Sequence, residues 1–173
     1  MARSIRFATP QDAEAIAATH CASWEEHYRG LIPDDVIDRR TFDLRLEMWT
    51  GFLSEPDRFT LVACDEAGNV VGFASATVLD PAQSGFDAYL QMLYLRAREK
   101  GAGTGRALLR ACARELAARG CRNMALRTLR LNPARGFYEH LGARLLPPDF
   151  PLDGGHFDDV AYAFDDLTRL YSA

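Results

Sequence analysis

The hydrophobic pattern changes its period along the chain. Apolar and polar residues alternate over residues 4–8, which predicts a strand. Apolar residues then recur at helical spacing and predict a helix over 10–28, where Pro10 suits the first turn. Two shorter helices are predicted over 33–37 and 41–53. The first third of the chain is therefore expected to be mainly helical.

From residue 58 the pattern becomes that of strands. Two apolar runs flank the turn sequence DEAGN and predict a β-hairpin of residues 58–64 and 70–79. A third strand is predicted over 86–95. A glycine-rich loop follows, and leucines at helical spacing then predict a helix that ends at Gly120.

The last third combines strands with one helix. It contains a predicted strand over 122–129, a helix over 132–142, and strands over 143–146 and 156–164. No internal repeat, linker or low-complexity tract interrupts this order. Because 173 residues can bury one core, we expect residues 1–173 to form a single domain of mixed α/β class.

The composition argues against several classes of protein. The net charge of −4 is not that of a nucleic-acid-binding protein, which presents a basic face. No window of about 18 residues is apolar throughout, and the first residues lack the apolar core of a secretory signal. The four cysteines are far apart and form no C-x-x-C pair, which favours reduced thiols over a metal site. A cytoplasmic protein without membrane or nucleic-acid partners is expected.

Three glycines at alternate positions, Gly101, Gly103 and Gly105, separate a strand from a helix. A glycine cluster costs conformational entropy and therefore needs a reason. At a helix start, free amide groups and the helix dipole converge and create a site for an anion such as phosphate. The glycines alone leave one alternative open, which is a tight turn where helix and strand pack closely.

Two common phosphate motifs do not match this loop. The Walker P-loop requires Lys and then Ser or Thr after its last glycine, whereas Arg106 and Ala107 follow Gly105. The dinucleotide fingerprint G-x-G-x-x-G requires a carboxylate at the end of the next strand. Here the spacing is G-x-G-x-G and that strand ends in LRTL. A nucleoside-triphosphate or dinucleotide site is therefore not expected.

The segments around the loop resemble one enzyme family. LYLRAREKGAGTGRALL resembles the acetyl-CoA motif of the GNAT N-acetyltransferase superfamily, whose core is [QR]-x-x-G-x-[GA]. NPARGFYEHLGA resembles the second motif of the family, and residues 5–37 resemble the N-terminal segment of many bacterial members. The resemblance covers nearly the whole chain in the right order.

The resemblance implies a GNAT fold, in which a mixed, mostly antiparallel sheet of about six to seven strands is flanked by helices and splayed at the acetyl-CoA site. It implies acetyl-CoA as the cofactor, with no metal. The strand before the loop would hold the pantetheine arm through its backbone, and the loop amides would wrap the pyrophosphate. The implied CoA-binding residues are Leu93, Tyr94, Leu95, Lys100, Gly101, Ala102, Gly103, Thr104, Gly105, Arg106, Asn132 and Tyr138.

Two of these residues depart from the family pattern. Lys100 stands where the family usually has Gln or Arg, so the charge is kept without the fork geometry of arginine. Asn132 is one residue closer to Tyr138 than the motif expects. Whether Asn132 contacts CoA or only caps a helix is therefore open.

The resemblance also implies direct transfer of an acetyl group from acetyl-CoA to a primary amine. Tyr138 matches the general acid that protonates the CoA thiolate. Family members often carry a glutamate in the strand before the loop, but Tyr89 stands at that place. Glu26 and Asp87 are the candidate general bases, and a base acting through water stays open. The missing glutamate favours one alternative function, a non-catalytic module that binds acyl-CoA as a sensor or interaction partner.

The acceptor site is predicted from aromatic residues. Trp24 and Tyr28 are four residues apart and share one helical face, where they either line the acceptor pocket or pack in the core. Tyr89 and His156 are the other candidate acceptor-binding residues. The acceptor is expected to be a small-molecule or peptide amine. Because members of the family often form homodimers, a homodimer is expected as well.

Overall fold

A computed structural model describes residues 3–148, 150 and 158–172. Its described residues form one sheet of seven strands in the order β1-β2-β3-β4-β5-β7-β6. All neighbouring strands are antiparallel except β4 and β5, which are parallel. The strands are β1 (Ser4–Phe7), β2 (Arg58–Cys64), β3 (Val70–Gln83), β4 (Phe86–Leu95), β5 (Met124–Leu129), β6 (Arg144–Leu145) and β7 (Asp159–Phe164). The predicted mixed, mostly antiparallel fold is confirmed.

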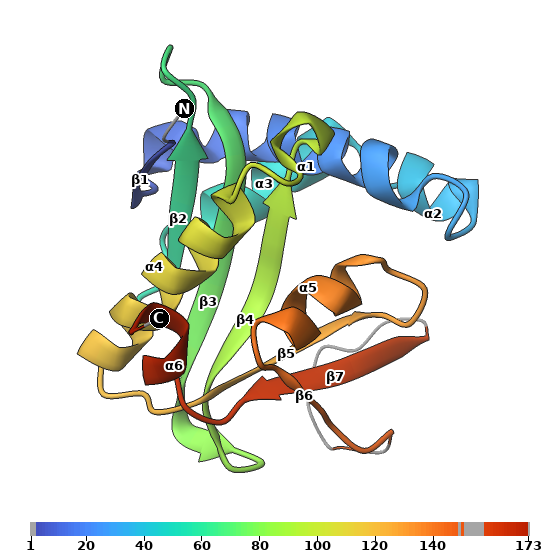
Figure 1. The fold of residues 1–173 in the computed structure, drawn as a ribbon. Coiled ribbons are helices and arrows are strands. Elements are labelled where there is room, and N and C mark those ends of the chain that lie inside the picture. Colours follow the sequence, from blue (N-terminus) through green and yellow to red (C-terminus); the bar gives the residue numbers. More distant parts are fainter. Residues whose placement is uncertain (1–2, 149, 151–157, 173) are drawn as a thin grey trace.

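Helices cover both faces of the sheet. They are α1 (Ala13–Tyr28), α2 (Asp34–Asp38), α3 (Phe42–Phe52), α4 (Thr104–Ala118), α5 (Ala134–His140) and α6 (Thr168–Tyr171), and short 3-10 turns occur at η1 (Pro10–Asp12) and η2 (Ala97–Glu99). Figure 1 shows α4 crossing the sheet on the face opposite α1 and α3. No helix within the described ranges is long and apolar enough to cross a membrane.

Each face has its own core. Leu108, Leu109 and Leu116 of α4 are fully buried against the central strands, as their helical spacing predicts. On the other face Ile16 of α1 and Trp49 of α3 are fully buried in a second cluster. The helices therefore fix the sheet from both sides.

Two elements differ from the predictions. The strand β3 reaches Gln83 rather than residue 79, because Ser84 and Gly85 both adopt positive φ (51° and 86°) and close a tight hairpin in which Gln83 pairs with Phe86. The short helix α6 was not predicted. Its start is capped by Asp166, whose carboxylate accepts hydrogen bonds from the backbone and hydroxyl of Thr168.

The sheet opens between β4 and β5. These two strands pair only at Tyr89–Ala125 and Leu90–Leu126, although β4 continues to Leu95. Figure 1 shows the two strands diverging beyond this point. On its other side β4 carries a β-bulge, because the register with β3 skips Gln91. The predicted splay of the sheet is confirmed, and it leaves one edge of β4 without a strand partner.

Candidate functional site

The divergence of β4 and β5 creates a cleft of about 1220 Å³. Its walls come from the end of β4, the glycine loop, β5, α5 and the helices α1 and α3. The predicted cofactor loop and the aromatic residues of α1 therefore line the same cleft. This arrangement brings most of the predicted site residues to one place.

The glycine loop leaves its backbone amides free and its outer surface open. Gly101 and Gly103 have φ values of 76° and 81°, a region that other residues rarely adopt, and an added Cβ at either would meet nothing within 4 Å. The amides of Gly101 and Gly103 donate to no partner among the described residues, and neither do those of the first turn of α4, residues 104–106. The loop thus presents several unpaired donors, which the predicted anion site requires.

Gly105 serves a second purpose. A Cβ on this residue would lie 3.1 Å from Leu95 Cδ1 and 3.5 Å from the ring of Phe137. The third glycine therefore lets α4 approach β4 and α5 closely. Gly105 thus fits the close-packing alternative, and the anion site remains a prediction for Gly101 and Gly103.

Not every predicted loop residue offers a free group. The amides of Lys100 and Ala102 already donate to Ala97 and Glu99 within the loop, at 3.1 and 3.3 Å. The side chains of Lys100 and Arg106 are exposed and line the cleft. They bring two positive charges to the rim of the donor row.

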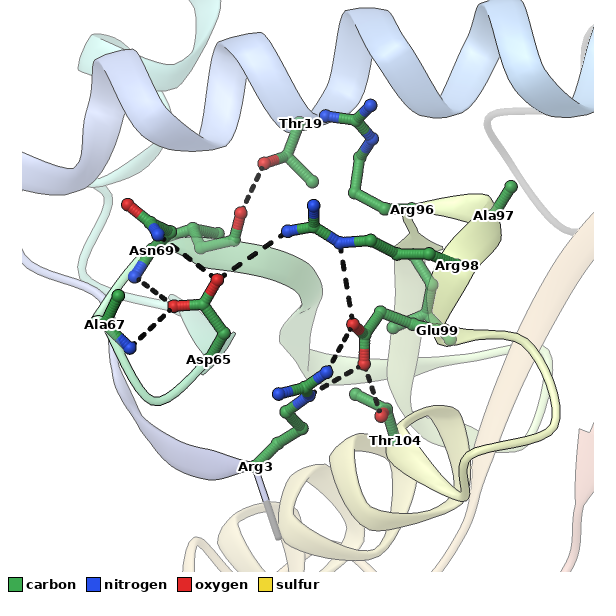
Figure 2. Close-up of polar contacts among 12 residues, drawn as sticks. Arg3, Thr19, Asp65, Ala67, Asn69, Arg96, Ala97, Arg98, Glu99 and Thr104 are labelled. Carbon is green, nitrogen blue, oxygen red and sulfur yellow. Dashed lines mark hydrogen bonds and ion pairs between the residues drawn. The ribbon is translucent and has the colours of Figure 1, made fainter. Parts of the chain in front are cut away.

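A buried carboxylate that the sequence did not indicate holds the loop in place. Glu99 is 1% exposed, and its two oxygens accept hydrogen bonds from Arg3, each at 2.9 Å, and from the hydroxyl of Thr104 at 3.0 Å. Figure 2 shows this cluster, in which Arg98 lies between Glu99 and Asp65. The Arg3 guanidinium lowers the pKa of Glu99. The loop is therefore tied to the N-terminal strand and to the first turn of α4.

We expect Glu99→Gln to destabilise the protein by about 2 kcal/mol at pH 7, because it removes charged hydrogen bonds from a buried group. Since the folded pKa of Glu99 lies below its ordinary value of about 4.5, this stabilisation is complete above pH ~5 and is lost as the pH falls through the folded pKa. Urea unfolding of both proteins between pH 7 and 3 measures the difference. It should shrink with acidification.

Glu115→Gln is the matched control for Glu99→Gln. Glu115 pairs with Arg119 one turn further along the exposed face of α4, so little change is expected at any pH. A pH-independent difference between Glu99→Gln and wild type would show that the charge of Glu99 does not stabilise the loop.

Tyr138 lies where a general acid would be needed. It comes from α5, lines the cleft and is 6% exposed. Its ring contacts Phe137 and Tyr162, and its hydroxyl has no hydrogen-bond partner among the described residues. Burial raises the pKa of Tyr138, and the nearby Tyr94 and Tyr89 add to the effect. The hydroxyl therefore keeps its proton throughout the physiological range.

The side chain of Asn132 bonds to the first residue of α5 and to a tyrosine of α1. Its side-chain oxygen accepts from the Ala134 amide at 2.9 Å, while its amide nitrogen donates to the hydroxyl of Tyr28 at 3.3 Å. The Tyr28 hydroxyl in turn donates to that of Tyr94 at 3.4 Å. Burial raises the pKa of both tyrosines. A polar chain of neutral groups thus links α5 to α1 and β4.

The two candidate bases lie in different places. Glu26 lines the cleft, but its carboxylate accepts from Arg96 at 2.8 Å and from the Ala97 amide at 2.6 Å. Burial opposes its ionisation, yet these bonds outweigh burial and lower the pKa of Glu26. Asp87 lies near the opposite end of β4, where it accepts from the Arg122 amide at 2.8 Å, and it does not line the cleft.

The acceptor candidates on described residues all line the cleft. Trp24, Tyr28 and Tyr89 lie on its wall, and burial raises the pKa of Tyr89 to about 12. The fourth candidate, His156, lies outside the described residues. Asp159 at the start of β7 is a further cleft residue that the sequence reasoning missed, and its charge raises the pKa of Tyr28 and Tyr89. The folded sheet brings Asp159 to the cleft, and no local pattern in the sequence indicates this position.

Comparisons with known proteins agree with this geometry. The family model of the acetyltransferase (GNAT) family matches residues 16–143. The uncharacterized N-acetyltransferase YuaI of Bacillus subtilis (strain 168) is 30% identical over 168 residues, covering 96% of this chain and 95% of YuaI. The chain belongs to the GNAT family of acetyltransferases. This enzyme class was predicted from the motifs and is confirmed.

One further relative and one solved structure are also similar to this GNAT protein. The aminoglycoside N(6')-acetyltransferase type 1 of Stenotrophomonas maltophilia is 32% identical over 128 residues, covering 72% of this chain and 74% of that enzyme. Among solved structures, the PaiA N-acetyltransferase of Thermoplasma acidophilum in complex with coenzyme A has a TM-score of 0.74 at 20% identity, covering 94% and 98% of the two chains. That likeness shows that the fold is shared.

Proposed function

We propose that this enzyme transfers the acetyl group of acetyl-CoA to a primary amine by direct attack of the amine. One observation carries the proposal. A single cleft is lined by the glycine loop with its unpaired amides, by the buried Tyr138 and by aromatic residues of α1. An anionic cofactor, a proton donor and an acceptor pocket would then share one cleft, as acyl transfer requires.

The residues present fit coenzyme A. Gly101 and Gly103 adopt positive φ, and the space that a Cβ would occupy at each is open, which suits a bulky diphosphate. Lys100 and Arg106 supply positive charge at the rim. From Gln91 to Tyr94 the edge of β4 has no strand partner among the described residues, and its backbone would suit an extended amide chain, whereas the Leu95 carbonyl is already bonded to Ser23 and His27. Acetyl-CoA, when bound, supplies a thioester whose carbonyl carbon accepts the amine.

Tyr138 would donate its proton to the departing sulfur. The amine nitrogen forms the new bond to the carbonyl carbon while the carbon–sulfur bond breaks, and the sulfur takes the proton of the tyrosine hydroxyl. The nitrogen gives up a proton in the same turnover, so the phenol can be restored. A tyrosine with a raised pKa suits this role because it stays protonated until the thiolate leaves.

A carboxylate on the cleft wall would hold the acceptor ammonium. Asp159 lies beside Tyr28 and Tyr89 on the aromatic wall. We assign ammonium binding to Asp159 and removal of the proton to a water molecule.

Turnover is measured as thiol release from acetyl-CoA with a panel of primary amines, and the acetylated amine is identified by mass spectrometry. The proposal expects one acetylated amine for each thiol released. Tight binding of acetyl-CoA with no acetylated product for any amine would instead support the non-catalytic acyl-CoA module. The available hydroxyl of Tyr138 in the cleft favours the enzyme.

We expect kcat/KM to rise with pH through about 9, because the acceptor ammonium, with a pKa near 10, must lose a proton before it attacks. Since burial raises the pKa of Tyr138 above its ordinary value of 10.0, the acid should not limit the rate below that pH. A pH–rate profile of the wild type measures this. A falling limb centred below pH 9 would contradict the assignment of Tyr138 as the acid.

A further inference from the structure

The guanidinium of Arg45 is buried without an opposite charge. Arg45 lies in α3, is 4% exposed and lines the cleft. Its Nε has no hydrogen-bond partner, and no carboxylate within the described residues forms an ion pair with it. Burial lowers the pKa of Arg45. An unpaired buried cation is rare because burial removes its hydration.

The groups around Arg45 do not supply the missing charge. Its guanidinium carbon lies 4.6 Å from the centre of the Trp24 ring, and that of Arg40 lies 4.8 Å from the same ring. Arg40 has the same sign and lowers the pKa of Arg45 further. Cys21 and Tyr94 are near, but burial raises the pKa of both, so they remain neutral.

His20 on the same wall is neutral as well. Trp49 Nε1 donates to His20 Nδ1 at 3.2 Å. Burial first, then the charges of Arg45 and Arg40, lowers the pKa of His20 well below its ordinary value. Among these neighbouring groups, the two guanidinium groups alone are charged, and they make this wall positive. A cation–π contact recovers less than the cost of burying an unpaired cation.

The position of Arg45 separates it from the cofactor loop. α3 lies on the face of the sheet opposite α4, the helix that begins at the glycine loop (Figure 1). An anion at Arg45 is therefore not a phosphate held by that loop. It would belong to the molecule that enters the cleft from the aromatic side.

We propose that Arg45, with Arg40 beside it, binds an acidic group of the acceptor. The acceptor is then an amine that carries a carboxylate or a phosphonate, that is, an amino acid or its phosphonate analogue. This inference rests on the proposed function, since it names the acceptor class for the same cleft. A polycationic aminoglycoside would meet two positive charges here and is disfavoured.

The first experiment compares matched acceptors with the wild-type enzyme. Each common L-amino acid is assayed against its own amide, and 2-aminoethylphosphonate against ethanolamine, with kanamycin as the polycationic probe. We expect at least one acid to exceed its neutral partner by about 10-fold or more in kcat/KM, since a charged hydrogen bond supplies that much. The carboxylate and phosphonate pairs show which acid the site takes.

The second experiment uses Arg45→Met, which keeps an unbranched, flexible side chain and removes its charge. We expect kcat/KM for the preferred acid to fall about 10- to 100-fold and the ratio of kcat/KM between the acid and its amide to fall to about one. The melting temperature should stay equal or rise, because an unpaired buried cation is removed. Arg39→Met, on the exposed side of α2 where Arg39 pairs with Asp35, is the matched control and should leave the acid preference intact.

Binding is measured apart from turnover by the thermal shift that each acceptor causes in the presence of CoA. A shift with acids that Arg45→Met abolishes supports the anion subsite even if no amine is acetylated, which would overturn only the transfer function. Equal kcat/KM for acids and amides in the wild type overturns the subsite and leaves the transfer function standing. A fall in melting temperature for Arg45→Met with unchanged acid preference assigns Arg45 to the fold and also overturns it.

Discussion

Gly103→Val is expected to abolish acetyl-CoA binding, with a loss of affinity of at least about 100-fold, while the protein stays folded. Gly103 has a φ of 81°, and its missing side chain faces open space above the loop amides. Valine there is strained and places its methyl groups over the donors that would hold the diphosphate. Calorimetric titration with acetyl-CoA measures the affinity, and circular dichroism reports the fold.

Gly68→Val separates the effect of strain from the effect of position. Gly68 has a similar φ of 86° and equally open surroundings, but it lies in the turn between β2 and β3, away from the cleft. Both variants should lose comparable stability, and only Gly103→Val should lose acetyl-CoA. Unchanged affinity in Gly103→Val would remove the loop from the binding site.

Tyr138→Phe is expected to lower kcat by about 100-fold or more and to change the affinity for acetyl-CoA less than about twofold. Loss of a general acid typically lowers the rate by about 10²–10⁴. Because no described residue hydrogen-bonds to the Tyr138 hydroxyl, the variant leaves no orphaned partner, and its melting temperature should not fall. Steady-state kinetics and calorimetric titration together measure both quantities.

Tyr162→Phe is the matched control for Tyr138→Phe. The Tyr162 ring centre lies 6.5 Å from that of Tyr138, but its hydroxyl accepts from Arg135 at 2.9 Å, donates to Glu139 at 2.5 Å and lies outside the cleft. This variant should lose stability and keep its kcat. An unaffected rate in Tyr138→Phe would return Tyr138 to a packing role.

Much of the fold could be predicted because several helices and strands carry a residue pattern that recurs along their length. Leu108, Leu109, Cys112 and Leu116 of α4 recur at helical spacing, and the hairpin of β2 and β3 is marked by a glycine turn between two apolar runs. The short helix α6 carries no such repetition, so it was missed. The glycine loop was found because its glycines, strand and helix all occur together in the sequence.

The rest of the site depends on pairings that no local pattern contains. Arg3 and Glu99 are 96 residues apart, and only the folded chain joins them. Arg45 follows an exposed helix start, and nothing near it in the sequence distinguishes it from a solvated arginine. Asp87 was chosen as the carboxylate nearest to Tyr89, which stands at the place of the family's glutamate, but it lies near the end of β4 that is opposite the loop. Site residues supplied by distant elements therefore require the structure.

The most direct test of the account is a calorimetric titration of the wild-type protein with acetyl-CoA, with NADH and ATP as controls. The geometry of the loop and the open edge of β4 predict micromolar binding of acetyl-CoA alone, with one site in each chain. Equal binding of all three ligands would show that the loop recognises phosphate groups only. Absence of acetyl-CoA binding would contradict the assignment of this cleft as the site of acetyl transfer.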